Sequence, residues 1–322
     1  MRPRPRRPDD PVIPRTPLVG AAALVLLLAV PATAAGQGEP PARPAGGASG
    51  AAWFPDSTAF RPLLAAPREV DLRGSLIVAD RRAAGGQDFG GSNLEAEVVL
   101  GHRIGVVRFQ DEGSGRPAIT LGFEVAVFNR FALETSEKDL IGNDYRVGLP
   151  LSLRAGGWSG RLVLLHVSSH LGDDFIARFG APMPRRQVTR DGFELTVARR
   201  LLPGLRLYGG ADLNFHANPG VERVAGRWGL EWDPAPGRAG GGATGDGASG
   251  GGTEVWPFAA VDAEVTPETA GPSVTGAAGV AIRVRGMTMR LEARGHTGPG
   301  TLGQLDGRDE DFLGVGLRLD PL

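Results

Sequence analysis

Apolar and polar residues alternate at period two along most of this chain. The alternation is clearest over residues 144–154, where every second residue is apolar: Tyr145, Val147, Leu149, Leu151 and Leu153. Successive side chains of a β-strand point to opposite faces, so this segment predicts a strand with one apolar and one polar face. Similar segments recur about a dozen times, which predicts an all-β protein.

The number of strands depends on how one junction is interpreted. Alternating segments cover residues 70–78, 94–100, 119–127, 144–154, 193–200, 205–215, 223–232, 280–285, 287–292 and 313–319, with further segments between them. Gly101-His102 either makes a tight turn or lies inside one long strand, so the count is 12 or 13. Single-chain bacterial barrels have even numbers of strands, which favours about 12.

The polar faces of the predicted strands separate two kinds of β-protein. An antiparallel sheet on a soluble core also alternates. Here, however, the polar faces carry many full charges of both signs: Arg73, Glu95, Glu124, Arg146, Glu194, Arg206, Asp212, Arg227, Asp262, Glu264 and Arg290. A closed membrane barrel needs apolar side chains against lipid, polar ones inside and no free edge. We therefore predict a closed antiparallel outer-membrane β-barrel whose interior charges pair across a narrow or closed lumen.

The first residues carry the pattern of a secretion signal. Five arginines precede an apolar run from Leu18 to Val30, and Ala32-Thr33-Ala34 follows as a small-x-small cleavage site. This order predicts a signal peptide over residues 1–34. An uncut membrane anchor is the alternative, but the run is short for a span and Pro31 interrupts it. We expect secretion to the outer membrane, contact with its lipids and insertion by the barrel-assembly machinery.

The rest of the chain divides by composition. Residues 35–52 are rich in Pro, Gly and Ala and are predicted to be a disordered leader, and residues 53–322 are predicted to form the barrel domain. Residues 53–67 form an ordered entry segment with aromatic anchors in this interpretation. Residues 234–253, mostly Gly and Ala, form a flexible loop. The chain ends in Asp320-Pro321-Leu322, without the terminal aromatic residue expected of a barrel-assembly signal.

Composition excludes several kinds of chemistry. There is no cysteine, which excludes disulfides, thiolate metal sites and a catalytic thiol. The formal net charge of −1 argues against nucleic acid as a partner. The oligomeric state is left open by the sequence.

One short segment has residues suited to catalysis. His166, Ser168 and His170 are spaced two apart, so all three emerge on one face of a strand. A histidine beside a serine acts as general base and activates the hydroxyl for attack on an ester. Asp173 or Asp174, just past the strand, or Glu194 on the next one, is expected to orient the imidazole. The short turn at Gly156-Gly157 is typical of the periplasmic side, which places this cluster at the outer mouth near lipid headgroups.

The facing of this cluster has two interpretations. Leu162 and Leu164 share its parity, which favours a lipid-facing site, whereas the polar side chains favour an inward hydrogen-bonded cluster with Asp173. Candidate binding residues around it are Asp144, Arg146, Ser169, His170 and Asp174. We expect no cofactor. Calcium is the alternative, because Asp144, Asp173 and Asp174 offer carboxylates that suit it, although they lack the regular spacing of a calcium-binding loop. His102, His216 and His296 are interpreted as isolated residues.

The histidine–serine segment also resembles a motif of known hydrolases. His166-Val167-Ser168 is similar to the His-x-Ser strand motif of outer-membrane phospholipase A and the lipid A deacylase. That resemblance implies Ser168 as nucleophile and His166 as base. The asparagine that often follows the serine is Ser169 here.

A second resemblance spans most of the chain. Residues 53–55, 60–65, 67–68, 140–150 and 168–174 resemble a bacterial family known as domain of unknown function 1207. It implies an envelope protein with no assigned activity. The glycine-rich residues 240–252 depart from it.

Three functions follow from these observations. The leading one is a structural or envelope-maintenance barrel with a narrow or closed lumen. The alternative is a serine-type lipid ester hydrolase using Ser168, His166 and Asp173. The third, a channel for small solutes, is disfavoured by the paired interior charges.

Overall fold

The computed structural model describes residues 50–55, 57–82, 93–110, 117–179, 188–219, 221–236, 253–267, 271–305 and 309–320. The signal peptide, most of the leader and most of the glycine-rich loop lie outside the described residues, so these interpretations stay predictions. The last leader residues, 50–52, belong to a short strand, β1 (Gly50–Trp53).

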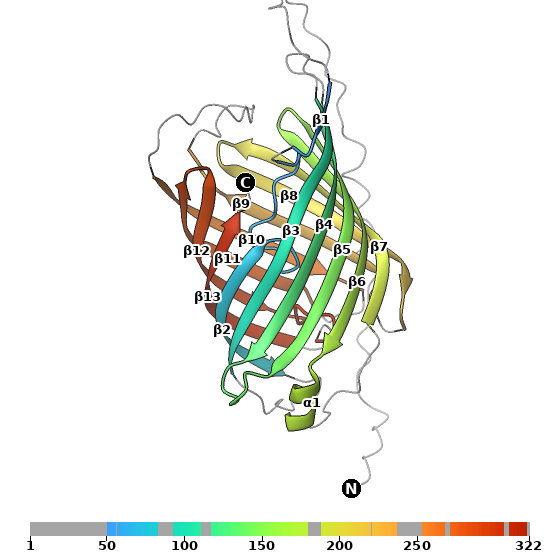
Figure 1. Cartoon of the computed structure of the whole chain (residues 1–322), viewed down its shortest axis with the longest axis vertical. Coiled ribbons are helices and arrows are strands. Elements are labelled where there is room, and N and C mark those ends of the chain that lie inside the picture. The colour runs from blue at the N-terminus through green and yellow to red at the C-terminus, as the bar shows by residue number, and fades with distance from the viewer. Residues whose placement is uncertain are drawn as a thin grey trace, which may run out of the picture. The chain divides into compact units, whose positions relative to one another are not determined.

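Twelve strands of the described chain form a closed antiparallel barrel (Figure 1). They are β2 (Leu72–Arg82), β3 (Leu94–Gln110), β4 (Ala118–Ala132), β5 (Leu140–Ala155), β6 (Trp158–Leu171), β7 (Val188–Leu202), β8 (Leu205–Ala217), β9 (Val224–Trp232), β10 (Glu254–Val265), β11 (Ser273–Val284), β12 (Met287–Thr297) and β13 (Asp309–Asp320). Each pairs with the next, and β13 pairs with β2 to close the ring. The predicted fold is confirmed.

Gly101 and His102 lie inside a single strand, which decides the strand count. β3 runs unbroken for 17 residues and pairs with β4 across both positions. β2 covers only the first part of β3, and β1 pairs with its last residues. The extra strand is therefore an addition beside the ring rather than a thirteenth member of it.

Three connections, β5–β6, β7–β8 and β11–β12, are only two residues long. A seven-residue helix, α1 (Asp173–Phe179), follows β6. No helix among the described residues is long and apolar enough to cross a membrane.

Side-chain facing follows the period-two pattern. Along β5 and β6, Leu149, Leu151, Leu162 and Leu164 are exposed on the outside, while the alternate residues are buried inside. In a soluble protein these apolar side chains would form the core. An apolar exterior around a charged interior is instead the arrangement of a barrel that faces lipid.

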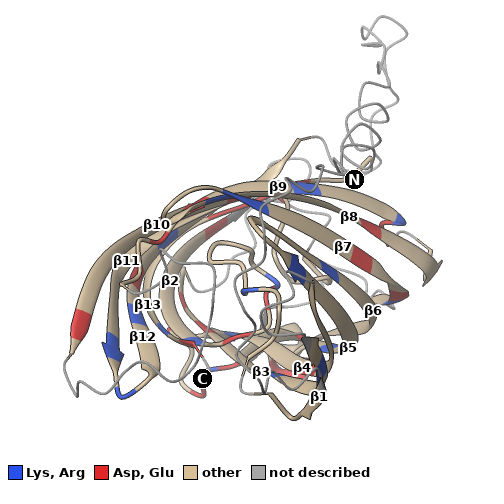
Figure 2. Ribbon diagram, turned by 90° about the horizontal axis from the view of Figure 1, so that it is seen from above, with Lys and Arg blue, Asp and Glu red and all other residues tan. Residues whose placement is uncertain are grey.

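Two segments of the chain fill the barrel interior. Residues 57–71, here called the inner segment, precede β2 and bury Phe60, Leu63 and Leu64 at 2% exposure or less. Residues 298–305, here called the lumen loop, follow β12, and Leu302 and Leu305 are buried in one cluster with Val70 of the inner segment. Figure 2 shows chain crossing the space enclosed by the strands.

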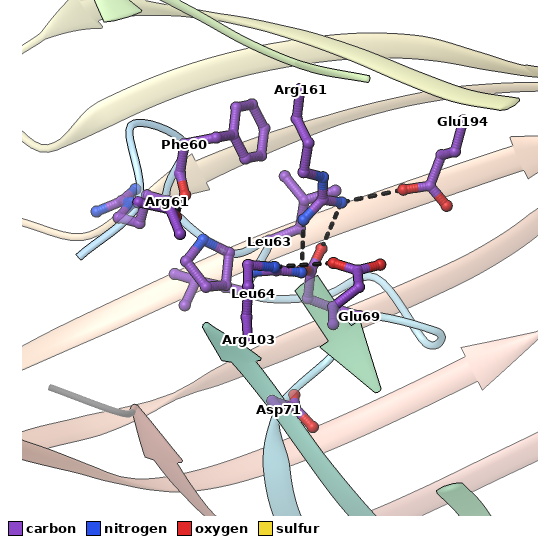
Figure 3. A network of polar contacts seen from close by, with 12 residues as sticks. Phe60, Arg61, Leu63, Leu64, Glu69, Asp71, Arg103, Arg161 and Glu194 are labelled. Carbon is purple, nitrogen blue, oxygen red and sulfur yellow. Dashed lines mark hydrogen bonds and ion pairs between the residues drawn. The ribbon is translucent and has the colours of Figure 1, made fainter. Parts of the chain in front are cut away.

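Ion pairs also attach the inner segment to the strands of the barrel. The Glu69 carboxylate accepts two hydrogen bonds from Arg161, at 2.7 and 3.0 Å, and one from Arg103 at 2.6 Å (Figure 3). Arg161 also binds Glu194 at 3.1 Å. Burial raises the pKa of Glu69, but the two guanidinium groups outweigh it and hold that pKa well below its usual value.

These contacts belong to a larger ring of ion pairs. Acids and arginines alternate around it, each paired with the next: Glu69, Arg103, Glu124, Arg146, Glu194, Arg161 and back to Glu69. Three negative and three positive charges cancel, so the ring is neutral while every member is buried in the lumen. Pairing of this kind is what makes buried charges tolerable.

Small cavities lie beside the inner segment. Two cavities lined by described residues have volumes of about 30 Å³ and about 10 Å³, and both include Arg68 in their walls. A buried water needs roughly 10–15 Å³, so the larger cavity has room for about two waters and the smaller for about one at most.

Candidate functional site

β6 carries its polar cluster on the outside of the barrel. His166, Ser168 and His170 alternate with the buried residues Val167 and Ser169. They continue the outward row that begins with Leu162 and Leu164, here called the outer row of β6. The lipid-facing interpretation of the cluster therefore matches the structure.

Asp191 on β7 is the acidic partner of His166. The two residues are directly paired across the strands, and His166 Nδ1 lies 2.7 Å from Asp191 Oδ1. Their side chains are 50% and 34% exposed, so the contact lies on the outer surface. A carboxylate on Nδ1 orients the ring and leaves Nε2 free to take a proton from a hydroxyl.

Ser168 is the next residue along the same outer row. It pairs with Tyr145 on β5 and Thr189 on β7. Among the described residues its hydroxyl makes no hydrogen bond to His166. Two residues of a strand advance about 6.6 Å, so rotation of both side chains toward each other is needed to bring Oγ to the imidazole.

The site lies where the apolar band ends. On β5, Tyr145 packs edge-on against His170 with ring centroids 5.8 Å apart, and its hydroxyl accepts a hydrogen bond from Asn143 at 3.1 Å. Apolar residues Val147, Leu149 and Leu151 follow on the outer face of the strand. An aromatic residue between apolar and polar positions is typical of the membrane interface.

Three predicted binding residues lie on the other side of the wall. Asp144, Arg146 and Ser169 are buried in the lumen. Asp144 accepts a hydrogen bond from Gly303 N at 2.9 Å, and Ser169 Oγ accepts one from Gln304 N at 3.0 Å. Arg146 belongs to the charged ring, as does Glu194. The wall therefore separates these residues from His166 and Ser168.

Asp173 and Asp174 begin α1, beyond the end of β6, and both are exposed. Neither makes a hydrogen bond to His166 within the described chain. Acidic residues are favoured in the first turn of a helix, which accounts for their position. No group of three or more His, Asp or Glu side chains in the part that the structure describes is arranged to hold a metal ion.

The remaining histidines have different surroundings. His216 on β8 pairs directly with Asp191 on the side away from His166. His296 is buried, stacks on Phe312 with centroids 5.2 Å apart, and contacts Thr275 Oγ1 at 2.8 Å through Nδ1. His102 is exposed on β3. His216 is thus not isolated, because it flanks the acid of the candidate site.

Asp191 is the site residue that sequence reasoning misses, because the alternation is conspicuous only from Phe193 onward. β7 in fact starts at Val188, and Thr189, Asp191 and Phe193 share the spacing of Leu195 and Val197. That extended periodicity is a usable signal. The pairing of Asp191 with His166 cannot be read from the sequence in this way. It depends on the register between β6 and β7, which are separated by a long connection.

These features together define a class of protein. A closed antiparallel barrel with an apolar exterior and a charged, filled interior has the fold of bacterial outer-membrane barrels. The family model "Protein of unknown function (DUF1207)" matches residues 47–236, more than half of the chain, and the chain belongs to this family. The family resemblance seen in the sequence is thereby confirmed. No curated protein matches the chain.

Solved structures of other proteins are similar to this chain. Outer membrane phospholipase from Salmonella typhi, a dimer with bound calcium, is 11% identical with a TM-score of 0.50, covering 78% of this chain and 90% of that one. Outer membrane phospholipase A from Escherichia coli is 13% identical with a TM-score of 0.49, covering 78% and 91%. LpxR from Salmonella typhimurium is 12% identical with a TM-score of 0.34, covering 76% and 99%. At such identities the likeness concerns the fold alone.

Proposed function

We propose that this protein is an outer-membrane acyl ester hydrolase that acts on membrane lipids, with Ser168 as nucleophile, His166 as general base and Asp191 as the group that orients the imidazole. One observation carries the proposal: His166 contacts Asp191 at 2.7 Å on the lipid-facing wall, and Ser168 is next to His166 in the same outer row. The sequence suggested Asp173 as the acid that orients the imidazole; in this proposal Asp191 has that role.

The proposed reaction proceeds through an acyl-enzyme. Ser168 Oγ attacks the ester carbonyl carbon while His166 Nε2 takes its proton, and the protonated imidazole then gives that proton to the departing alcohol as the ester C–O bond breaks. Water, deprotonated by His166, cleaves the acyl–serine ester and restores the hydroxyl. Asp191 stabilises the imidazolium in both steps. General-base catalysis of this kind contributes roughly 10²–10⁴-fold.

The position of the site supports a lipid substrate. Leu164 on β6 and Phe193 on β7 are exposed and follow the site toward the apolar band, where acyl chains would lie. The ester groups of a membrane lipid lie between its acyl chains and its headgroup, at the level of an aromatic residue such as Tyr145. The lipid itself is either a phospholipid or lipid A in this proposal.

Three short turns support an orientation of the barrel with the site at its outward end. The β5–β6, β7–β8 and β11–β12 connections are short and lie at the end opposite the site. Short turns are typical of the periplasmic side. Together with the predicted signal peptide, this supports placement of the site in the outer leaflet of the outer membrane.

A structural or envelope-maintenance barrel is the second candidate. It is favoured by the interior, where the inner segment, the lumen loop and the charged ring occupy the lumen and two cavities lined by described residues measure about 30 and 10 Å³. The same observation disfavours the small-solute channel. Calcium stays a hypothesis that chelation tests directly.

Fatty-acid release tests the proposal. Purified protein in mixed micelles is supplied separately with phospholipid and with lipid A, with and without a calcium chelator. We expect release from at least one lipid, and its loss in Ser168→Ala and in His166→Ala. Ser159→Ala, on the same strand, and His102→Ala, exposed on β3, are the matched controls and should retain activity. Equal release by Ser168→Ala and the unmodified protein would remove the proposal and leave the structural barrel.

A further inference from the structure

The lumen loop binds the wall of the barrel directly behind the candidate site. Gln304 N donates to Ser169 Oγ at 3.0 Å, and Gln304 Nε2 donates to the Ser169 carbonyl at 2.9 Å. Gly303 N donates to Asp144 Oδ2 at 2.9 Å. All four residues that take part are inside the barrel, so these bonds are shielded from competing water.

The two wall residues that the loop binds are neighbours of the site. Asp144 on β5 and Ser169 on β6 are directly paired in the register. The adjacent pair, one residue along, is Tyr145 with Ser168, and its side chains point outward. The loop therefore holds the inner side of the wall one residue away from the nucleophile.

The close approach of the loop depends on a glycine. A Cβ atom at position 303 would lie 3.0 Å from both Ser169 Cβ and Val188 Cγ1, closer than carbon atoms ordinarily pack. Val188 is the residue of β7 that pairs with Ser169. The loop thus touches β5, β6 and β7, the three strands that carry Tyr145, Ser168 and Asp191.

We propose that Gln304 and Ser169 are positioning residues. They act through the barrel wall to fix the position of the Ser168 side chain relative to His166 and Asp191. This inference rests on the proposed function and assigns the filled lumen a role in it: the loop supports the site instead of only closing a passage. Positioning matters because displacement of a catalytic group by about 1 Å costs up to ~10²-fold in rate.

Two variants remove the bonds selectively. Gln304→Met keeps the length of the side chain but loses the Nε2 donor, and Ser169→Ala loses the hydroxyl acceptor. Each should lower kcat for lipid ester hydrolysis about 10-fold with little change in KM, because substrate contacts on the outer face are untouched. Leu305→Ala is the control, since it weakens packing of the same loop without removing either bond.

Hydrogen exchange provides a readout that is independent of activity. The backbone amides of residues 166–171 should exchange at least several-fold faster in Gln304→Met and Ser169→Ala than in the unmodified protein, and no faster in Leu305→Ala. Unchanged exchange together with unchanged kcat in both variants would overturn the inference. If the unmodified protein hydrolyses no lipid, the proposed function fails. Exchange alone then decides whether the loop holds this part of β6.

Discussion

His166 on β6 and Asp191 on β7 are directly opposite each other, and their side chains meet at 2.7 Å on the outer face of the barrel. Polar side chains are costly against lipid, so a carboxylate and an imidazole at this place call for an explanation. Their mutual contact reduces that cost. Because Ser168 lies in the same row as His166, the three residues together form a candidate site for acyl transfer.

The first prediction concerns Asp191. Asp191→Asn keeps the size of the side chain but favours the wrong imidazole tautomer, and we expect kcat for ester hydrolysis to fall by ~10²–10⁴-fold. Fatty-acid release in mixed micelles measures the effect. Asp311→Asn changes an exposed carboxylate on β13 and serves as the control. Equal activity of the two variants would show that Asp191 does not orient the base.

The second prediction concerns the inner segment. Glu69→Gln leaves Arg161 and Arg103 without their shared carboxylate inside the lumen, and removal of one partner from a buried pair typically costs about 3–5 kcal/mol of unfolding free energy. Urea unfolding in detergent at pH 7 measures the difference from the unmodified protein. A difference below about 1 kcal/mol would contradict the role given to the ring.

The difference in unfolding free energy between the unmodified protein and Glu69→Gln should also depend on pH. The folded-state pKa of Glu69 is held below the ordinary value of 4.5, so its charge stabilises the fold fully above that value. The stabilisation is lost as the pH falls through the folded-state pKa. The gap in unfolding free energy between the unmodified protein and Glu69→Gln should therefore be constant from pH 6 to 8 and narrow below about pH 4. A gap that widened in acid would have the wrong sign.

The third prediction tests which side of β6 faces lipid. Leu164→Arg places a charge on the outer row and should destabilise the fold, since an arginine facing lipid costs ~2–4 kcal/mol at the bilayer midplane and about 0–1 kcal/mol near the interfaces. Unfolding from lipid vesicles measures it, with Leu164→Met as the apolar control. A stability for Leu164→Arg equal to that of the control would contradict the outward facing of this row.

The fourth prediction concerns passage through the barrel. The lumen holds the inner segment, the lumen loop and small cavities, so the protein should show no steady conductance in planar bilayers. A fully open porin-like barrel measured beside it provides the positive control. Stable stepwise conductance would favour the solute channel and require the inner segment to leave the lumen.

Much of the fold was predictable because strand facing is a local property. The alternation around Leu149 and Leu151 correctly predicts that apolar side chains lie outside. Because bacterial barrels have even numbers of strands, 12 strands were favoured over 13, and the position of Gly101 inside β3 agrees with that choice. The contents of the lumen were not predictable. Phe60 and Leu302 enter the barrel through contacts between distant segments, which no local pattern records.

The candidate site was also only partly predictable from the sequence. His166 and Ser168 were found because residues two apart on a strand share a face. Asp191 was not, since its partner is decided by the register of β6 on β7. Ser169 was grouped with the site because it follows Ser168 in the sequence, and Asp144 because it offers a carboxylate. Both residues are one position away from an outward-facing residue of their own strand, Ser168 and Tyr145, so their side chains lie in the lumen.

The most direct test of the account is covalent labelling of Ser168 in the folded barrel. A fluorophosphonate with an alkyl chain phosphonylates a serine hydroxyl only where a neighbouring base activates it, and mass spectrometry of peptides locates the adduct. We expect one adduct, on Ser168, that is lost in His166→Ala and strongly reduced in Asp191→Asn, while Ser159 and Ser169 stay unlabelled. An unlabelled Ser168, or equal labelling in His166→Ala, would contradict the account.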